Sequence, residues 1–179
     1  MVATGNVVQA VRAGRSMTAE LEAVSAELRP GVQALSFQVM RQLGRAIALR
    51  ALLAKKAPPP AADALLCTAL ALVWDEHAAP YPVHTLVNQV VEAAQQQRQT
   101  RPQSRFINAC LRRFMRERAE LVARTETDPH AQWNHPHWWV ERLQLEHPEQ
   151  WQTLLSVAQK PAPMTLRVHQ GHHTVAAYQ

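Results

Sequence analysis

The chain has 179 residues, of which 47% are hydrophobic, 18% charged and only 6% aromatic. These proportions argue against a disordered or fibrous chain, because they supply enough apolar surface for one globular domain and the beginning of a second. The low content of glycine, β-branched and aromatic residues argues against a β-sandwich or a glycine-rich nucleotide-binding sheet. The composition therefore predicts an all-α protein.

Positive charge is concentrated in two segments of the chain. The formal net charge is only +5, but residues 29–62 contain six cations and no acid. Residues 98–118 contain seven arginines and a single glutamate. Because each segment alone carries more positive charge than the whole chain, the remainder is acidic. A polyanionic partner is expected from this distribution, nucleic acid rather than membrane.

In the first third of the chain, apolar residues recur at helical spacing. A short apolar pattern over residues 6–13 ends at Gly14, a typical residue just beyond a helix. Residues 17–28 are predicted to form one amphipathic helix. A third helix begins near Pro30 and either continues or kinks at Gly44; three consecutive prolines at 58–60 must end it.

Further helices are predicted in the rest of the chain. The pattern over 61–75 is apolar enough to occupy the centre of a bundle, and a one-faced helix follows from residue 83. The polar run 95–105 is expected to be a mobile loop. Beyond it we expect a helix over 106–122, a polar linker over 124–134 and two short tryptophan-containing helices, followed by a strand over 161–168.

The helix over 106–122 and the loop before it carry the strongest functional signal. At 100° per residue the apolar side chains gather on one side, and three arginines occupy a narrow arc on the opposite side. A guanidinium group offers a rigid fork of donors that matches phosphate oxygens, so these arginines are candidates for contact with a nucleic-acid backbone. The alternative is an ordinary solvated cationic face. The arginine face consists of Arg105, Arg112 and Arg116, with Arg113 on its flank and Arg98 and Arg101 in the preceding loop.

A second group of cations is less well phased on one helix. It comprises Arg41, Arg45, Arg50, Lys55 and Lys56. Here a solvated face is the favoured interpretation, with RNA contact as the alternative. Whether this group lies beside the arginine face depends on the tertiary arrangement of the helices.

The cysteines indicate a reducing compartment, and the hydropathy pattern indicates neither secretion nor a membrane span. Cys67 and Cys110 lie within apolar helical runs, which favours buried thiols over a disulfide framework. The N-terminal stretch lacks the apolar core of a signal peptide, and the longest apolar run, 64–74, is too short to span a bilayer. A cytoplasmic protein without membrane contact is expected.

Several histidines and tryptophans could be candidates for metal or base binding, but structural roles explain them better. His135, His137 and the pair 172–173 lack a cysteine or carboxylate at zinc-like spacing, so no metal site is predicted. Trp138 and Trp139 are expected to pack against a core rather than stack on bases. No glycine-rich phosphate loop or hydrolase motif is present, so the sequence predicts neither catalytic residues nor a resident cofactor.

Five stretches of the sequence, taken in order, resemble bacterial small-subunit rRNA cytosine-C5 methyltransferases of the Sun/Fmu type. The first four-fifths of the chain also resembles the all-helical, RNA-binding NusB fold. The resemblance covers nearly the whole chain, and its motifs are specific in combination. The stretches are VVQAVRAGRSMTAEL, YPVHTLVNQVVEAA, SRFINACLRRF, HPHWWVERLQLEHPEQW and PMTLRV.

The resemblance implies a NusB-like RNA-binding domain over 1–123 and a helical linker over 124–179 that leads toward a methyltransferase region. In that family the S-adenosylmethionine site and the catalytic cysteines lie further along the chain, so neither is expected here. The implied partners are small-subunit rRNA and the protein's own catalytic domain. Only the segment 106–113 matches a family motif residue by residue; His169, where the family often has Asn, and the basic, alanine-rich stretch 41–60 depart from the pattern.

Two other functions remain open at this point. The bundle could chiefly be a docking module, with an apolar patch formed by Trp133, Trp138, Trp139 and Trp151. It could also be a stand-alone transcription antitermination factor of the NusB type, an alternative that the PMTLRV stretch opposes.

Overall fold

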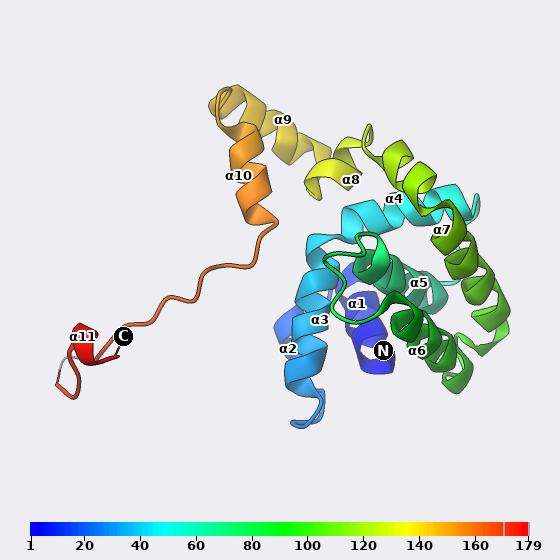
Figure 1. Cartoon of the computed structure of the whole chain (residues 1–179), viewed down its shortest axis with the longest axis horizontal. Coiled ribbons are helices and arrows are strands. Elements are labelled where there is room, and N and C mark those ends of the chain that lie inside the picture. The colour runs from blue at the N-terminus through cyan, green and yellow to red at the C-terminus, as the bar shows by residue number, and fades with distance from the viewer. Residues whose placement is uncertain (170, 179) are drawn as a thin grey trace.

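The computed structural model describes residues 1–169 and 171–178, and every regular element in that part of the chain is a helix (Figure 1). The predicted all-α class is confirmed. The elements are α1 (Val2–Arg12), α2 (Met17–Glu22), α3 (Arg29–Arg41), α4 (Leu43–Leu53), α5 (Pro60–Val73), α6 (Val83–Gln96), the 3₁₀ turn η1 (Arg101–Gln103), α7 (Ser104–Thr125), α8 (Pro129–Trp133), α9 (His137–Glu146), α10 (Trp151–Ala158) and α11 (Val175–Tyr178).

Helix α5 is the centre of the bundle. All of its residues from Ala62 to Val73 are buried, and it packs against α1, α3, α4, α6 and α7. A helix that is apolar all round is stable only when neighbours cover every side. The predicted central position of the segment 61–75 is confirmed, and the prolines at 58–60 lie where α4 has ended and α5 begins.

The amphipathic segment 17–28 is helical for only part of its length. α2 ends at Glu22, and turns follow. The guanidinium of Arg29 donates to the carbonyl oxygens of Glu22 and Val24, which occupies acceptors that the helix end leaves without partners. The apolar stripe is nevertheless real, because Leu21 is buried against Val7 and Val32.

The helix expected either to continue or to kink at Gly44 is broken at Gln42, where φ is −120° and ψ is 11°. Asn134, in the turn after α8, fills the break from the outside. Its side-chain oxygen accepts from the backbone N–H of Gly44 at 2.6 Å, and its amide donates to the carbonyl oxygen of Met40 at 2.8 Å. One side chain therefore satisfies the end of α3 and the beginning of α4, and it docks α8 onto α4.

The polar run 95–105 forms more structure than expected. α6 continues to Gln96, and η1 leads directly into α7. Thr100 is fully buried, and its hydroxyl donates to the carbonyl oxygen of Ala94 at 2.9 Å. The expected mobile loop is thus a short connection anchored by a threonine.

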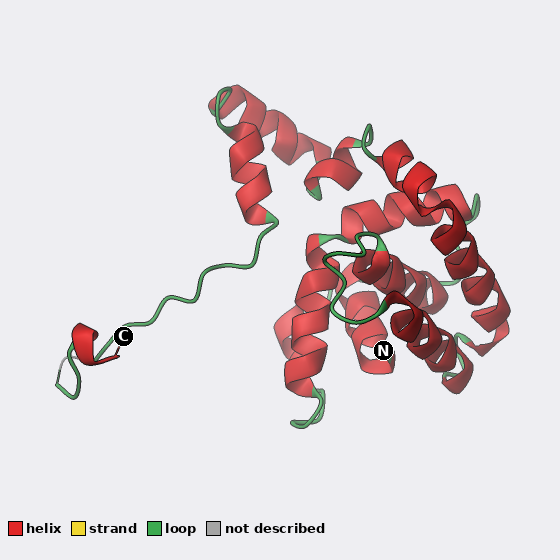
Figure 2. Cartoon of the chain, in the orientation of Figure 1, coloured by secondary structure: helices red, strands yellow, loops and turns green. Residues whose placement is uncertain are grey.

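The strand predicted over 161–168 is wrong. These residues form an extended coil beyond α10, and no strand occurs in the part of the chain that the structure describes (Figure 2). A strand requires a hydrogen-bonded neighbour, and the residues 161–168 have none among the described residues. α9 and α10 project from the bundle ahead of this coil (Figure 1).

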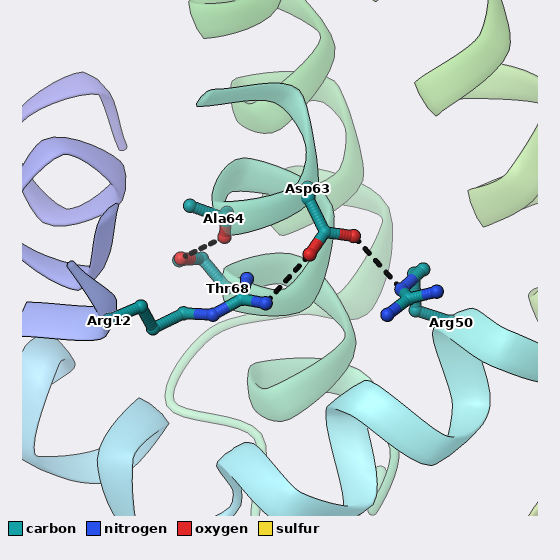
Figure 3. A network of polar contacts seen from close by, with 5 residues as sticks. All are labelled: Arg12, Arg50, Asp63, Ala64 and Thr68. Carbon is teal, nitrogen blue, oxygen red and sulfur yellow. Dashed lines mark hydrogen bonds and ion pairs between the residues drawn. The ribbon is translucent and has the colours of Figure 1, made fainter. Parts of the chain in front are cut away.

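A buried carboxylate ties three helices together (Figure 3). Asp63 on α5 is 5% exposed. Its Oδ2 accepts from Arg12 of α1 at 2.7 Å, and its Oδ1 lies 2.9 Å from the Nε of Arg50 of α4, an ion pair without hydrogen-bond alignment. Buried charges are tolerated only when they are paired in this way.

Candidate nucleic-acid interface

Helix α7 presents its arginines on the side opposite the core. Ile107, Cys110, Leu111, Phe114 and Leu121 are buried, as the helical spacing predicts. The side chains on the other side are open to solvent, and they include Arg105, Arg112 and Arg116. The predicted phasing of this helix is confirmed.

The arginines of this face have few partners inside the protein. Arg105 and Arg116 form no hydrogen bond or ion pair with any described residue, whereas Arg112 donates to the side chain of Asn108 at 3.3 Å. Arg98 is exposed in the connection after α6, and Arg101 donates to the carbonyl oxygen of Gln95 at 3.1 Å. None of these contacts neutralises a guanidinium, so the positive charge remains available to an anionic ligand.

Arg113 is the exception on the flank. Its Nε donates to Glu117 at 2.8 Å, and both side chains are partly exposed. Glu117 is also the residue at which α7 departs from helical geometry, with φ −110° and ψ 17°. The arginine face therefore belongs to the first half of α7, before this kink.

The part of the second basic segment that lies on α4 is adjacent to α7, because these two helices pack against each other. Its arginines, however, point mainly into the structure. Arg45 donates to the hydroxyl of Thr125 at 2.9 Å and lies over the ring of Trp74 at 4.5 Å from the centroid. Burial lowers the pKa of Arg45, and the nearby Glu126 opposes this effect. Arg50 is paired with Asp63.

The remaining cations of that segment lie apart from one another. Lys55 and Lys56 are exposed in the connection between α4 and α5. Arg41 is half-buried at the end of α3, with its guanidinium 6.0 Å from the centroid of the Phe37 ring. The structure thus groups the six arginines of the first surface along one element and its approach, whereas it disperses Arg41, Arg45, Lys55 and Lys56.

Both cysteines are buried free thiols, as predicted. Burial raises the pKa of Cys67 to about 11, an effect that the nearby Asp63 reinforces. Burial likewise raises the pKa of Cys110. A thiol with a raised pKa is a poor nucleophile, because the reactive species is the thiolate.

The expectation that Trp138 and Trp139 pack in a core is wrong. Trp138 is 65% exposed and Trp139 39% exposed, and the two rings contact each other edge to face at 5.6 Å. The spacing of Trp139 and Leu143 predicted an inward stripe, but α9 projects from the bundle and has few neighbours. Trp133 and Trp151 are half-buried and pack against each other at 5.1 Å.

The histidines do not converge with other ligands in the described part of the chain. His137 lies 3.3 Å from Glu141, and the rings of His169 and His172 are 4.7 Å apart. Among the described residues, no group of three histidine, cysteine, aspartate or glutamate side chains has the geometry to hold a metal ion. No helix found there is long and apolar enough to cross a membrane.

Two family models match this chain, and the first of them agrees with the helical bundle. Residues 4–116 match the NusB family, and residues 135–179 match the ferredoxin-like domain of RsmF/B-like methyltransferases. The first match covers more than half of the chain, so the chain belongs to the NusB family.

The chain is also similar to individual curated proteins. The chain is 31% identical over 175 residues to ribosomal RNA small subunit methyltransferase B of Vibrio cholerae, a match that covers 96% of this chain and 40% of the relative. It is 34% identical over 165 residues to the protein of that name from Pseudomonas putida, covering 91% of this chain and 37% of the relative. The chain therefore spans about two-fifths of the length of these relatives, and it aligns with their N-terminal part.

Proposed function

We propose that this chain is the RNA-binding region of an rRNA cytosine-C5 methyltransferase, and that it holds small-subunit rRNA through the arginine face. The observation that carries the proposal is the row formed by Arg105, Arg112 and Arg116, three exposed guanidinium groups without a carboxylate partner among the described residues. Phosphate contacts of this kind dominate affinity and depend on salt, whereas the shape of a folded RNA decides where such a surface sits.

The whole protein would transfer a methyl group from S-adenosylmethionine to C5 of a cytosine in the cytoplasm. The similarity to methyltransferase B proteins supports this activity. The residues of this chain would bind the RNA substrate rather than catalyse the transfer, since its two cysteines are buried thiols with raised pKa values. Domain boundaries near residues 123 and 124 belong to this proposal, with α8 to α10 as the connection to the catalytic part.

The test is a salt titration of binding between this chain and a small-subunit rRNA hairpin, with a scrambled RNA for comparison. Each phosphate contact contributes roughly 0.7 to 0.9 to the slope of log affinity against log salt. The double variant Arg112→Ala with Arg116→Ala should reduce that slope by about 1.4 to 1.8. Its melting temperature should not change appreciably, because both side chains are exposed.

A matched control removes the same charge elsewhere. Arg124 and Arg142 are exposed, and each is paired only with a glutamate four residues away on its own helix. The double variant Arg124→Ala with Arg142→Ala should retain the slope of the unmodified chain. If both double variants bind alike, or if the first unfolds earlier and binds normally per folded molecule, the arginine face is structural and the proposal fails.

A docking role is a second candidate, and one observation favours it. Large apolar side chains are exposed on α9 and α10, namely Trp138, Trp139, Leu145, Leu154 and Val157. An accumulation of exposed large apolar side chains on two neighbouring helices favours an interaction site. The proposed occupant is the protein's own catalytic domain, because the residues from 135 onward match a domain shared with RsmF/B-like methyltransferases.

Tryptophan quenching tests the docking role. Acrylamide should quench Trp138 efficiently in the 179-residue chain, and a Trp138→Phe variant should lose that component. In a protein that also contains the catalytic domain, the same component should be protected. Equal quenching in the two proteins would exclude docking at this surface.

A further inference from the structure

A cavity of about 350 Å³ lies where the chain beyond α10 meets the bundle. α3 and the end of α5 form one part of its wall, and Gln159 and Pro161 approach from the other part of the chain. The cavity thus requires both regions that the family models distinguish. Its volume falls within the range of sites that accept small ligands.

The lining combines an aromatic ring with one cation and one anion. Trp74 lines the cavity, and the guanidinium of Arg45 over its ring fixes the position of the indole. Arg41 and Asp75 also line the cavity, and neither has an oppositely charged partner within 4.0 Å among the described residues. An aromatic platform with a cation beside it is the usual arrangement for an unpaired nucleobase and its phosphate.

Three polar side chains of the lining offer free acceptors. The amide nitrogen of Gln38 donates to the carbonyl oxygen of Ala78 at 3.1 Å, and that of Gln159 donates to the carbonyl oxygen of Gln132 at 3.0 Å. Each amide nitrogen keeps a second N–H, and neither amide oxygen accepts a hydrogen bond from a described residue, so each oxygen is a free acceptor. Asp75 accepts from the N–H of His77 through Oδ1 alone, which leaves Oδ2.

A ligand that matches three acceptors must present several donors on one edge. Guanine does so with N1–H and the exocyclic N2 amino group, whereas uracil has a single donor on its pairing edge. We propose that this cavity binds an unpaired guanine of the RNA, with the base against Trp74, its donor edge toward Asp75 and the glutamine oxygens, and its phosphate at Arg41. The inference rests on the proposed function and deepens it, since it adds a base-reading site to a chain whose arginine face would contact only phosphates.

The experiment uses mononucleotides, which do not depend on the arginine face. Binding of 5′-GMP, 5′-IMP and 5′-UMP to the 179-residue chain is measured by saturation-transfer NMR. We expect GMP to bind about tenfold more tightly than UMP, a difference within the range of one good bidentate contact to a base edge. IMP lacks the 2-amino group and should lie between them. The variant Asp75→Asn should abolish the difference between GMP and IMP.

A filling variant tests the location. Ala34 lines the cavity from an exposed position on α3, so Ala34→Phe fills the space without burying a new group in the core. It should weaken GMP binding at least tenfold, while Ala119→Phe, at an exposed position on α7, should leave binding unchanged. Equal binding of GMP and UMP, or normal GMP binding by Ala34→Phe, would overturn the proposal.

The two proposals fail separately. The variant Arg112→Ala with Arg116→Ala should bind RNA more weakly and with a smaller salt slope, but it should bind GMP normally. If the unmodified chain binds GMP selectively and binds no RNA, the proposed function is wrong, and the cavity is a site for a free guanine nucleotide rather than for a base of RNA. If RNA binding persists without any preference for GMP, the cavity is not a base-reading site.

Discussion

Asp63 determines the role of two arginines that the sequence presents as free cations. In the sequence, Arg50 belongs to a basic run without acids, and Arg12 lies in a separate segment near the N-terminus. In the structure both guanidinium groups converge on one buried carboxylate from helices α1 and α4. The charges of these two arginines are thereby compensated inside the protein, and the three residues connect three helices.

Replacing Asp63 by Asn should lower the free energy of unfolding by about 3 kcal/mol, because removing one partner leaves buried charges uncompensated. Urea denaturation measures this change. Glu120→Gln is the control, since its contact with Arg124 is 4.0 Å long and exposed, and it should alter stability by less than about 0.5 kcal/mol. Similar stabilities of the two variants would show that the Asp63 network contributes little.

Cys67 gives the chain a pH dependence in the alkaline range. Burial raises the pKa of its thiol to about 11 from an ordinary value of 9.0. The folded state therefore holds the proton more tightly than the unfolded state, so the contribution to stability is complete below pH 9 and is lost as the pH rises through about 11. At pH 11 the free energy of unfolding should have fallen by roughly 2 kcal/mol on account of this thiol.

Urea denaturation of the unmodified chain and of Cys67→Ala, at several values from pH 8 to pH 11, measures this contribution. The stability of the unmodified chain should fall more steeply than that of the variant. Parallel curves would mean that the thiol is as accessible in the folded state as in the unfolded state. Comparing the two proteins removes the effect of other groups that titrate in this range.

At the scale of elements, the junction of α3 and α4 is formed by residues distant in sequence. Helical periodicity runs through residues 32–53, so the sequence pattern alone allows one long helix. At the break between α3 and α4, Asn134 bonds to the free N–H and carbonyl groups. Gly44 is required for this approach, since a Cβ at that position would lie 2.2 Å from the carbonyl oxygen of His130.

The two glycines of this helix pair provide a matched experiment. Gly44→Ala should destabilise the chain by about 2 kcal/mol, because the methyl group collides with backbone atoms of α8. Gly31→Ala has open space around it and should stabilise α3 by up to about 1 kcal/mol. Thermal unfolding separates the two effects. If both variants are stabilised, α8 does not dock at this junction in solution.

At the scale of the whole molecule, the chain divides into a packed bundle and a projecting C-terminal part. Residues 161–167 are exposed and extended beyond α10 (Figure 1). Such backbone is the preferred site of proteolysis, because a protease needs several residues in extended conformation. Lys160 precedes a proline, which blocks trypsin, so Arg167 is the accessible site in this segment.

Limited digestion with trypsin should therefore cut first after Arg167 and leave a stable fragment of residues 1–167. Mass spectrometry identifies the fragment, and Arg167→Gln should delay its appearance. Early cleavage after Lys56, between α4 and α5, would contradict this order and would show that the bundle opens before the C-terminal segment is attacked.

The cavity at Trp74 illustrates what local patterns miss. Its lining comes from α3, the end of α5 and the residues after α10, and no spacing within any one of these segments marks them as a site. The arginine face, in contrast, lies on one helix and its approach. A local pattern is sufficient there, because residues three, four and seven apart on a helix share a face whatever the rest of the chain does.

The sequence by itself determined the all-α class, the central helix, the buried cysteines and the phasing of α7, since these follow from hydrophobic periodicity within single elements. Tertiary structure alone decided that Arg45 and Arg50 turn inward, that Trp138 and Trp139 remain exposed, that a helix breaks beside Gly44 and that no strand forms over 161–168. Each of these outcomes depends on whether a distant group supplies a partner, through a carboxylate, a hydrogen bond or a packing surface. Periodicity fixes which side chains share a face, and only the fold fixes what that face meets.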